Sequence, residues 1–176
     1  MRPVNSFTIE MPRSIVFGPG SLEQLPSALG AARRVLVLSG ARWLAGSPWA
    51  AAIERLAAGR VVGRVAIAEG EPTTDSLARA CEAARAVDSD VIVAVGGGSV
   101  LDSAKALSAL LAHGGPVDRY LEGVEGSVAV PGPGIPWIAV PTTAGTGAEV
   151  TKNAVVRAPG LGDERNLYCL VGVLGQ

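Results

Sequence analysis

Apolar and polar positions alternate along the chain in blocks that predict strands and helices in turn. Four short, mostly aliphatic runs have the character of buried parallel strands: residues 34–38, 61–68, 91–95 and 137–140. Between the second and third runs, residues 74–87 place apolar side chains at the three- and four-residue spacing of a helix. Residues 100–112 and 42–58 are also compatible with helices, the latter beginning in regular form at about Pro48. Alternating strands and helices predict an α/β fold in which helices cover both faces of a parallel sheet.

Turn and capping residues predict where the other elements begin and end. Ser21 is expected to cap a short helix, and Thr74 or Asp75 to cap the helix that runs to residue 87. Residues 8–17, which Pro12 interrupts, are expected to form two short strands or an edge ribbon. The remaining predicted elements are a helix over 22–29, a surface loop over 113–135 and a strand over 150–157.

Composition narrows the classes of protein to which the chain can belong. Its 176 residues are 48% hydrophobic and include 23 glycines, which suits one globular domain with room for part of a second. The net charge is −1 and aromatic residues make up only 4%, so we expect no nucleic-acid partner. The spacing of the two cysteines suggests neither a disulfide framework nor a zinc site. Because we find no signal peptide and no apolar run near the ~18 residues of a membrane span, we expect a cytoplasmic protein.

A glycine-rich segment, Gly96-Gly97-Gly98-Ser99, stands between the third predicted strand and the helix after it. A strand that leads through glycines into a helix presents backbone N–H groups and the positive end of the helix dipole, which together bind phosphate. Small residues are needed there because a Cβ would block the approach of phosphate oxygens. The alternative is a tight strand–helix turn without a ligand, since the segment matches neither GxGxxG nor GxxxxGK[ST].

A second segment rich in small residues follows the fourth predicted strand and contains Thr142, Thr143 and Thr146. Hydroxyl groups at a strand exit suit a ribose, a phosphate or an amide. The alternative is an ordinary turn in which the threonines satisfy their own backbone. Ligands of parallel sheets bind beyond the carboxyl ends of the strands. Both segments follow strands, so we expect them to converge on one edge of the sheet.

Two charged residues, Asp102 and Lys105, follow the glycines and share one helix face. Two interpretations stay open: Asp102 contacts a bound molecule or orients the loop, or it is a first-turn carboxylate paired with a lysine one turn on. The single histidine, His113, follows a predicted helix and is expected to cap it or to be exposed rather than to act in catalysis.

Three segments together resemble the iron-containing (group III) alcohol dehydrogenase family, which includes maleylacetate reductases and glycerol dehydrogenase-like enzymes. GGGSVLDSAKA is similar to the family signature GGGSxxDxAK, and PTTAGTGAEVT is similar to PTTAGTGSEVT with Ala148 in place of serine. Residues 13–21 resemble the opening of the family, and the resemblance covers roughly residues 8–157. It implies a Rossmann-like NAD(P)-binding domain and hydride transfer between the nicotinamide and a small alcohol or carbonyl substrate.

The resemblance also implies roles for individual residues. Gly97, Gly98 and Ser99 would hold the pyrophosphate, the three threonines would line the ribose, phosphate and nicotinamide side, and Asp102 would lie near the nicotinamide. Lys105 would support the loop, and no catalytic residue is assigned. The predicted cofactor-binding residues are Ser39, Gly96, Gly97, Gly98, Ser99, Asp102, Thr142, Thr143 and Thr146.

The choice between NAD and NADP depends on the residues after the first predicted strand. An acidic residue at such a strand end binds the adenosine 2′-hydroxyl and repels a 2′-phosphate. The segment Ser39-Gly40-Ala41-Arg42 contains no carboxylate, and Ser39 with Arg42 would accept a 2′-phosphate. The alternative is that Arg42 only begins a helix and points to solvent.

The chain also departs from the family. Similar proteins are about twice as long, and their second, helical domain supplies a metal site from an aspartate and three histidines. Since an iron or zinc ion needs several ligands, we predict that this chain binds none. We expect a cofactor-binding domain over residues 1–157 and a divergent tail over 158–176, which a frameshift or premature stop would explain, or else a genuine short paralogue.

The expected function is that of an NAD(P)-dependent alcohol dehydrogenase whose cofactor-binding part, alone, is inactive. The alternatives are a maleylacetate reductase-type reductase, a stand-alone dinucleotide-binding module without catalysis, and an unstable product that aggregates through exposed apolar surface. The resemblance further implies a homodimer formed through the strands predicted within residues 8–17.

Overall fold

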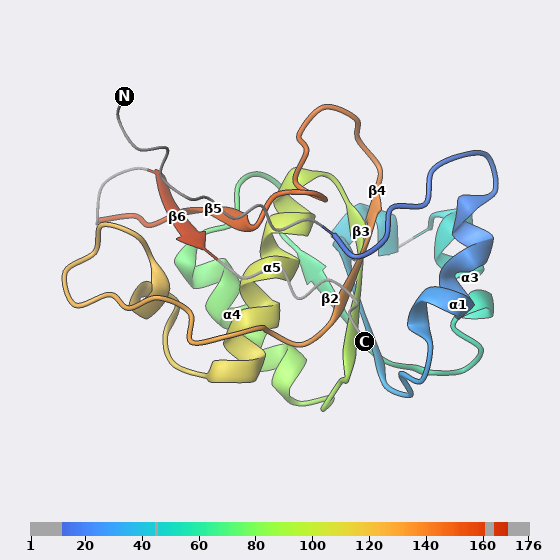
Figure 1. Ribbon diagram of the computed structural model, residues 1–176, viewed down its shortest axis with the longest axis horizontal. Coiled ribbons are helices and arrows are strands. Elements are labelled where there is room, and N and C mark those ends of the chain that lie inside the picture. Colours follow the sequence, from blue (N-terminus) through green and yellow to red (C-terminus); the bar gives the residue numbers. More distant parts are fainter. Residues whose placement is uncertain (1–11, 45, 161–163, 169–176) are drawn as a thin grey trace, which may run out of the picture.

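The computed structural model describes residues 12–44, 46–160 and 164–168, and its centre is a four-stranded parallel sheet (Figure 1). The strands are β1 (Val35–Gly40), β2 (Val61–Ile67), β3 (Val91–Gly96) and β4 (Trp137–Pro141), in the spatial order β2-β1-β3-β4. The direction of winding reverses between β1 and β3, as in doubly wound sheets of the flavodoxin type. The four predicted strands are confirmed, each within two residues of its expected ends.

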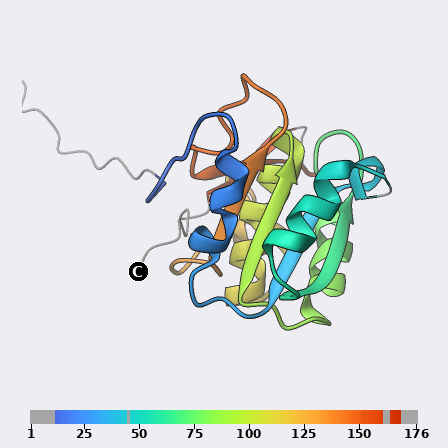
Figure 2. The same cartoon turned by 90° about the vertical axis from the view of Figure 1, so that its right-hand side faces the viewer.

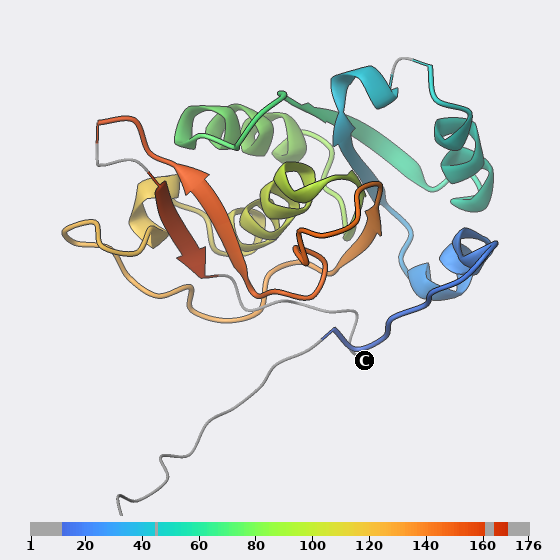
Figure 3. The same cartoon turned by 90° about the horizontal axis from the view of Figure 1, so that it is seen from above.

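Helices cover both faces of this sheet, as predicted (Figures 2 and 3). One face packs against α4 (Thr74–Arg85) and α5 (Gly98–His113), and the other against α1 (Leu25–Leu29) and α3 (Pro48–Leu56). The pleat of the strands explains the division: Leu36 and Leu38 of β1 lie in the first layer, whereas Val35 and Val37 lie in the second. Both central strands are therefore buried on both faces, which requires the unbroken aliphatic runs seen in the sequence.

The capping of α4 differs by one residue from the prediction. The N-cap is Thr73, not Thr74 or Asp75. Its Oγ1 accepts a hydrogen bond from the Ser76 N–H at 3.1 Å, and Ser76 Oγ accepts one from the Thr73 N–H at 2.8 Å. Any of the three neighbouring residues has a suitable side chain, and only Thr73 has a serine three positions later to complete a capping box. The expected start of α3 at Pro48 is confirmed, with Ser47 as its cap.

The N-terminal part of the described chain contradicts two predictions. The short helix begins as a 3-10 turn, η1 (Ser21–Gln24), before α1, and Gly20 rather than Ser21 takes the capping position with φ 76°. Residues 12–17 lie in no strand, and Phe17 is 99% exposed. Alternation alone does not make a strand, because a strand needs a neighbour for its backbone hydrogen bonds. Residues 8–11 of the predicted ribbon lie outside the described residues, and the implied dimer stays a prediction.

The remaining elements are short. A turn of helix, α2 (Ala41–Leu44), follows β1, and the predicted loop after α5 contains one 3-10 turn, η2 (Val117–Tyr120). The predicted strand over residues 150–157 forms as β5 (Asn153–Arg157). It pairs antiparallel with β6 (Glu164–Tyr168), for which the sequence predicted no structure. These two strands form a separate small sheet, which lies beside α4 and α5 in Figure 1.

Candidate functional site

Three connections leave the sheet at the same edge. β1, β3 and β4 run parallel, with Val95 opposite both Ser39 and Val140, and with Gly96 opposite Pro141. The chain therefore leaves all three strands at nearly the same level. In doubly wound sheets this edge, at the point where the winding reverses, is where ligands bind. The glycine segment leaves β3 at that point.

The glycine segment forms a direct passage from β3 into α5. Gly97 is the N-cap, with φ −83° and ψ −170°, and Gly98 is the first residue of the 16-residue helix. The N–H groups of a first helical turn have no partner within the helix, so those of Gly98 and Ser99 point outward at its positive end. A Cβ on Gly96 would lie 2.5 Å from Val100 Cγ2, so this glycine is required by packing within the chain.

The threonine loop, residues 142–152, lies directly against the glycine segment. The Thr142 N–H donates to the Gly96 carbonyl at 3.0 Å. A Cβ on Gly97 would lie 3.0 Å from Thr143 Oγ1, and one on Gly98 would lie 3.2 Å from Thr146 Cγ2. The predicted convergence of the two segments is confirmed by these distances. The three threonines are exposed, so this part of the loop presents its hydroxyls beside the start of α5.

Asp102 and Lys105 form a buried ion pair one turn into α5. Lys105 Nζ lies 2.8 Å from Asp102 Oδ1 and also donates to Thr151 Oγ1 at 3.0 Å and to the Asn153 carbonyl at 2.8 Å. Asp102 Oδ2 accepts from the Val155 N–H at 3.2 Å. The Lys105 side chain is 0% exposed and that of Asp102 is 15% exposed. Lys105 thus supports the chain that follows the threonine loop, as expected. The cofactor contact predicted for Asp102 stays a prediction.

At the end of β1, the two residues predicted to accept a 2′-phosphate, Ser39 and Arg42, differ in exposure. Ser39 is fully buried, and its hydroxyl donates to the Gly40 carbonyl at 3.4 Å. The Ser39 hydroxyl is therefore not exposed at the surface where the predicted cofactor contact would form. Arg42 is 86% exposed, and its Nε lies 2.5 Å from Oε1 of Glu69. Sequence reasoning missed Glu69, whose signal was its place two residues after β2.

Within the described chain, Oε2 of Glu149 in the threonine loop is buried and has no hydrogen-bond partner.

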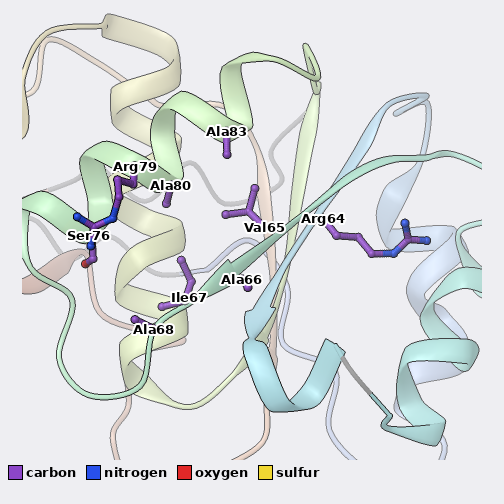
Figure 4. A pocket seen from close by; sticks show the side chains of 9 residues that line it. All are labelled: Arg64, Val65, Ala66, Ile67, Ala68, Ser76, Arg79, Ala80 and Ala83. Carbon is purple, nitrogen blue, oxygen red and sulfur yellow. The ribbon is translucent and has the colours of Figure 1, made fainter.

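A groove of about 240 Å³ lies between the edge strand β2 and α4 (Figure 4). Its lining includes Val65, Ile67 and Ser76 but none of the predicted cofactor-binding residues. The groove therefore does not belong to the candidate site.

His113 ends α5 at the opposite end from the glycines, with Nε2 3.1 Å from the carbonyl oxygens of Gly132 and Pro133. A structural role for this histidine, as expected, agrees with these contacts.

Among the residues that the structure describes, no three His, Cys, Asp or Glu side chains are grouped so that they would hold a metal ion. The described residues therefore do not fit the site of one aspartate and three histidines that the resemblance implies for a metal ion. No helix in the described part is both long and apolar enough to span a membrane.

Comparison with known proteins matches this architecture to one family. The family model for iron-containing alcohol dehydrogenases matches residues 12–170, which extends past residue 157, where the recognisable motifs end. Sulfoacetaldehyde reductase of Bilophila wadsworthia is 43% identical over 104 residues, which make up 58% of this chain and 26% of the reductase. NAD-dependent methanol dehydrogenase of Bacillus methanolicus is 30% identical over 149 residues, covering 83% of this chain and 38% of that enzyme.

Solved structures match the fold over nearly the whole chain. Sulfoacetaldehyde reductase from Bifidobacterium kashiwanohense, crystallised in complex with NAD+, has a TM-score of 0.84 at 24% identity and covers 95% of this chain. The match covers 44% of the reductase. The chain therefore spans less than half the length of these relatives.

Proposed function

The chain belongs to the iron-containing alcohol dehydrogenase family, and from this we propose that it binds a nicotinamide dinucleotide for hydride transfer to or from a small alcohol or carbonyl substrate. Members of the family are NAD(P)-dependent oxidoreductases that act on CH–OH groups. One observation carries the proposal: the glycine segment opens the long helix α5 at the point where the winding reverses, with the threonine loop against it.

The residues of this edge fit the pyrophosphate of a dinucleotide. The N–H groups of Gly98 and Ser99 would hold the phosphate oxygens, aided by the dipole of a 16-residue helix. The absence of a side chain at Gly97 leaves room for a close approach to the backbone. The exposed threonine hydroxyls would hold the ribose and nicotinamide side. The cofactor itself would supply the carbon that accepts or gives the hydride. That a structural relative was crystallised with NAD+ supports this assignment.

The proposed site would accept both NADH and NADPH, with Arg42 as the residue that distinguishes them. Arg42 and Glu69 stand after β1 and β2, next to the edge where the adenosine half would lie. Their exposed ion pair contributes at most about 1 kcal/mol, so a 2′-phosphate would compete for Arg42 at little cost. With NADH the pair would stay intact. With NADPH the arginine would turn to the phosphate and leave Glu69 solvated.

The substrate half of the reaction is not assigned to any described residue. We derive no step through a metal ion, because the described donor set does not fit one. A dinucleotide-binding module without catalysis is therefore the second candidate function. It is favoured by one observation, the close approach of the threonine loop to the glycine segment, in which both partners belong to the described chain.

Calorimetric titration with NADH and NADPH tests the proposal. We expect micromolar binding of both cofactors by the wild-type chain, and selective loss of NADPH affinity in Arg42→Ala. A turnover assay with small aldehydes and alcohols then separates the two candidate functions, since the binding module would bind without turnover. A folded sample that binds neither cofactor would contradict both.

A further inference from the structure

Lys105 is the most deeply buried charged side chain described, and its ammonium group is fully satisfied. All three of its N–H bonds have acceptors: Asp102 Oδ1, Thr151 Oγ1 and the Asn153 carbonyl, at 2.8, 3.0 and 2.8 Å. Lysines are almost never buried in this way unless they are paired. The pair is therefore a built feature of the fold, and the position of its partners indicates what it does.

The partners lie at the far end of the threonine loop. Thr151 is the last residue but one of that loop and Asn153 begins β5, so Lys105 holds the chain where the loop leaves the candidate site. Asp102 adds a second attachment through the Val155 N–H at 3.2 Å. At its near end the loop is attached to the same strand–helix unit, because the Thr142 N–H donates to the Gly96 carbonyl.

Between these two attachments the loop is also held by Ala148, which is buried in the core cluster on the α5 side of the sheet. Thr143 and Thr146 lie so close to Gly97 and Gly98 that an added Cβ would come within 3.0 and 3.2 Å of their side chains. No backbone hydrogen bond between the glycine segment and residues 143–150 is among those found in the described chain. A shift at the far end of the loop would therefore move the threonine hydroxyls away from the start of α5.

We propose that Asp102 and Lys105 are a positioning pair for the cofactor site: they fix the threonine loop over the glycine segment without touching the cofactor themselves. This inference rests on the proposed function for what the loop binds. In this proposal Asp102 acts through the loop, since each of its carboxylate oxygens accepts a hydrogen bond from within the chain. Lys105 is 0% exposed and likewise reaches no ligand.

The test uses Lys105→Met, with Thr151→Val as a milder variant that removes one acceptor and keeps the ion pair. Arg85→Met is the matched control, because Arg85 donates to the Leu110 carbonyl near the other end of α5. Hydrogen exchange measured by mass spectrometry reports the loop directly. We expect exchange in residues 142–155 to be about tenfold faster in Lys105→Met, with β3 unchanged, and a smaller effect in Thr151→Val.

Cofactor affinity supplies a readout that a purely structural role would not move. In Lys105→Met we expect NADH affinity to fall about tenfold and ADP affinity to fall much less, because ADP lacks the half that the threonines hold. The control should change neither. Unchanged exchange of residues 142–155, or equal losses of NADH and ADP affinity, would overturn the inference. If the wild-type chain binds no NADH, the proposed function fails and the exchange measurement alone decides this inference. If Lys105→Met does not fold, Thr151→Val decides it.

Discussion

The buried pair makes an asymmetric prediction about stability. Asp102→Asn removes one charge and leaves the Lys105 ammonium, 0% exposed, without a counter-ion. Breaking a buried pair in this way costs about 3–5 kcal/mol. Lys105→Met leaves the Asp102 carboxylate, which is 15% exposed and still accepts from the Val155 N–H, so the expected cost is smaller, about 2 kcal/mol. At about 2–4 °C per kcal/mol for a chain of this size, Asp102→Asn should lower Tm by roughly 6–20 °C.

The double variant, Asp102→Asn with Lys105→Met, removes both charges and gives the interaction free energy between the two side chains. Neutralising both partners of a buried pair is often close to neutral, so the double variant should be more stable than Asp102→Asn alone. Urea unfolding followed by circular dichroism gives the free energies of unfolding of the wild type, the two single variants and the double variant, and the cycle should show a coupling above about 1 kcal/mol. Additive losses, or Lys105→Met being the more damaging single change, would refute the argument from burial.

Three other predictions concern parts of the fold outside the candidate site. In Gly134→Ala the new Cβ would lie 2.6 Å from the Ser108 backbone, so we expect the free energy of unfolding in urea to fall by more than about 2 kcal/mol. The control Gly132→Ala, whose Cβ would have no atom nearer than 3.9 Å, should unfold like wild type. Thr73→Ala should cost about 1 kcal/mol in the same assay, because it removes the cap of α4, and a loss below about 0.3 kcal/mol would contradict that role. Burial raises the pKa of the Cys81 thiol. The stability that the neutral thiol contributes is therefore full below the unfolded pKa and is lost as pH rises above about 8.5, and Cys81→Ala should lose less stability over that range.

The centre of the sheet was predictable because β1 and β3 are buried on both faces. Residues 35–38 and 91–95 are aliphatic without interruption, and few structures other than a central parallel strand need such a run. The ribbon over residues 8–17 was not predictable in the same way. Alternation shows which side chains would share a face, but whether a neighbouring strand exists depends on the rest of the molecule.

The candidate site was predictable in outline and not in its contacts. Two segments that leave parallel strands must meet at one edge, so the approach of Thr143 to Gly97 followed from the order of elements. The partners of Lys105 did not, because Thr151 and Asn153 lie 46 and 48 residues away along the chain. The same limit applies to Ser39, whose complete burial is decided by the neighbouring elements rather than by its own sequence context.

The most direct test of the central claim is the NADH affinity of Gly97→Ala measured by calorimetry beside wild type and Gly132→Ala. The added Cβ at Gly97 would lie 3.0 Å from Thr143 Oγ1, between the two segments proposed to hold the dinucleotide, while Gly132 lies by His113 at the opposite end of α5. We predict micromolar binding in wild type and Gly132→Ala and a loss of about tenfold or more in Gly97→Ala. Equal affinity in all three folded proteins would show that the glycine segment is not the cofactor site.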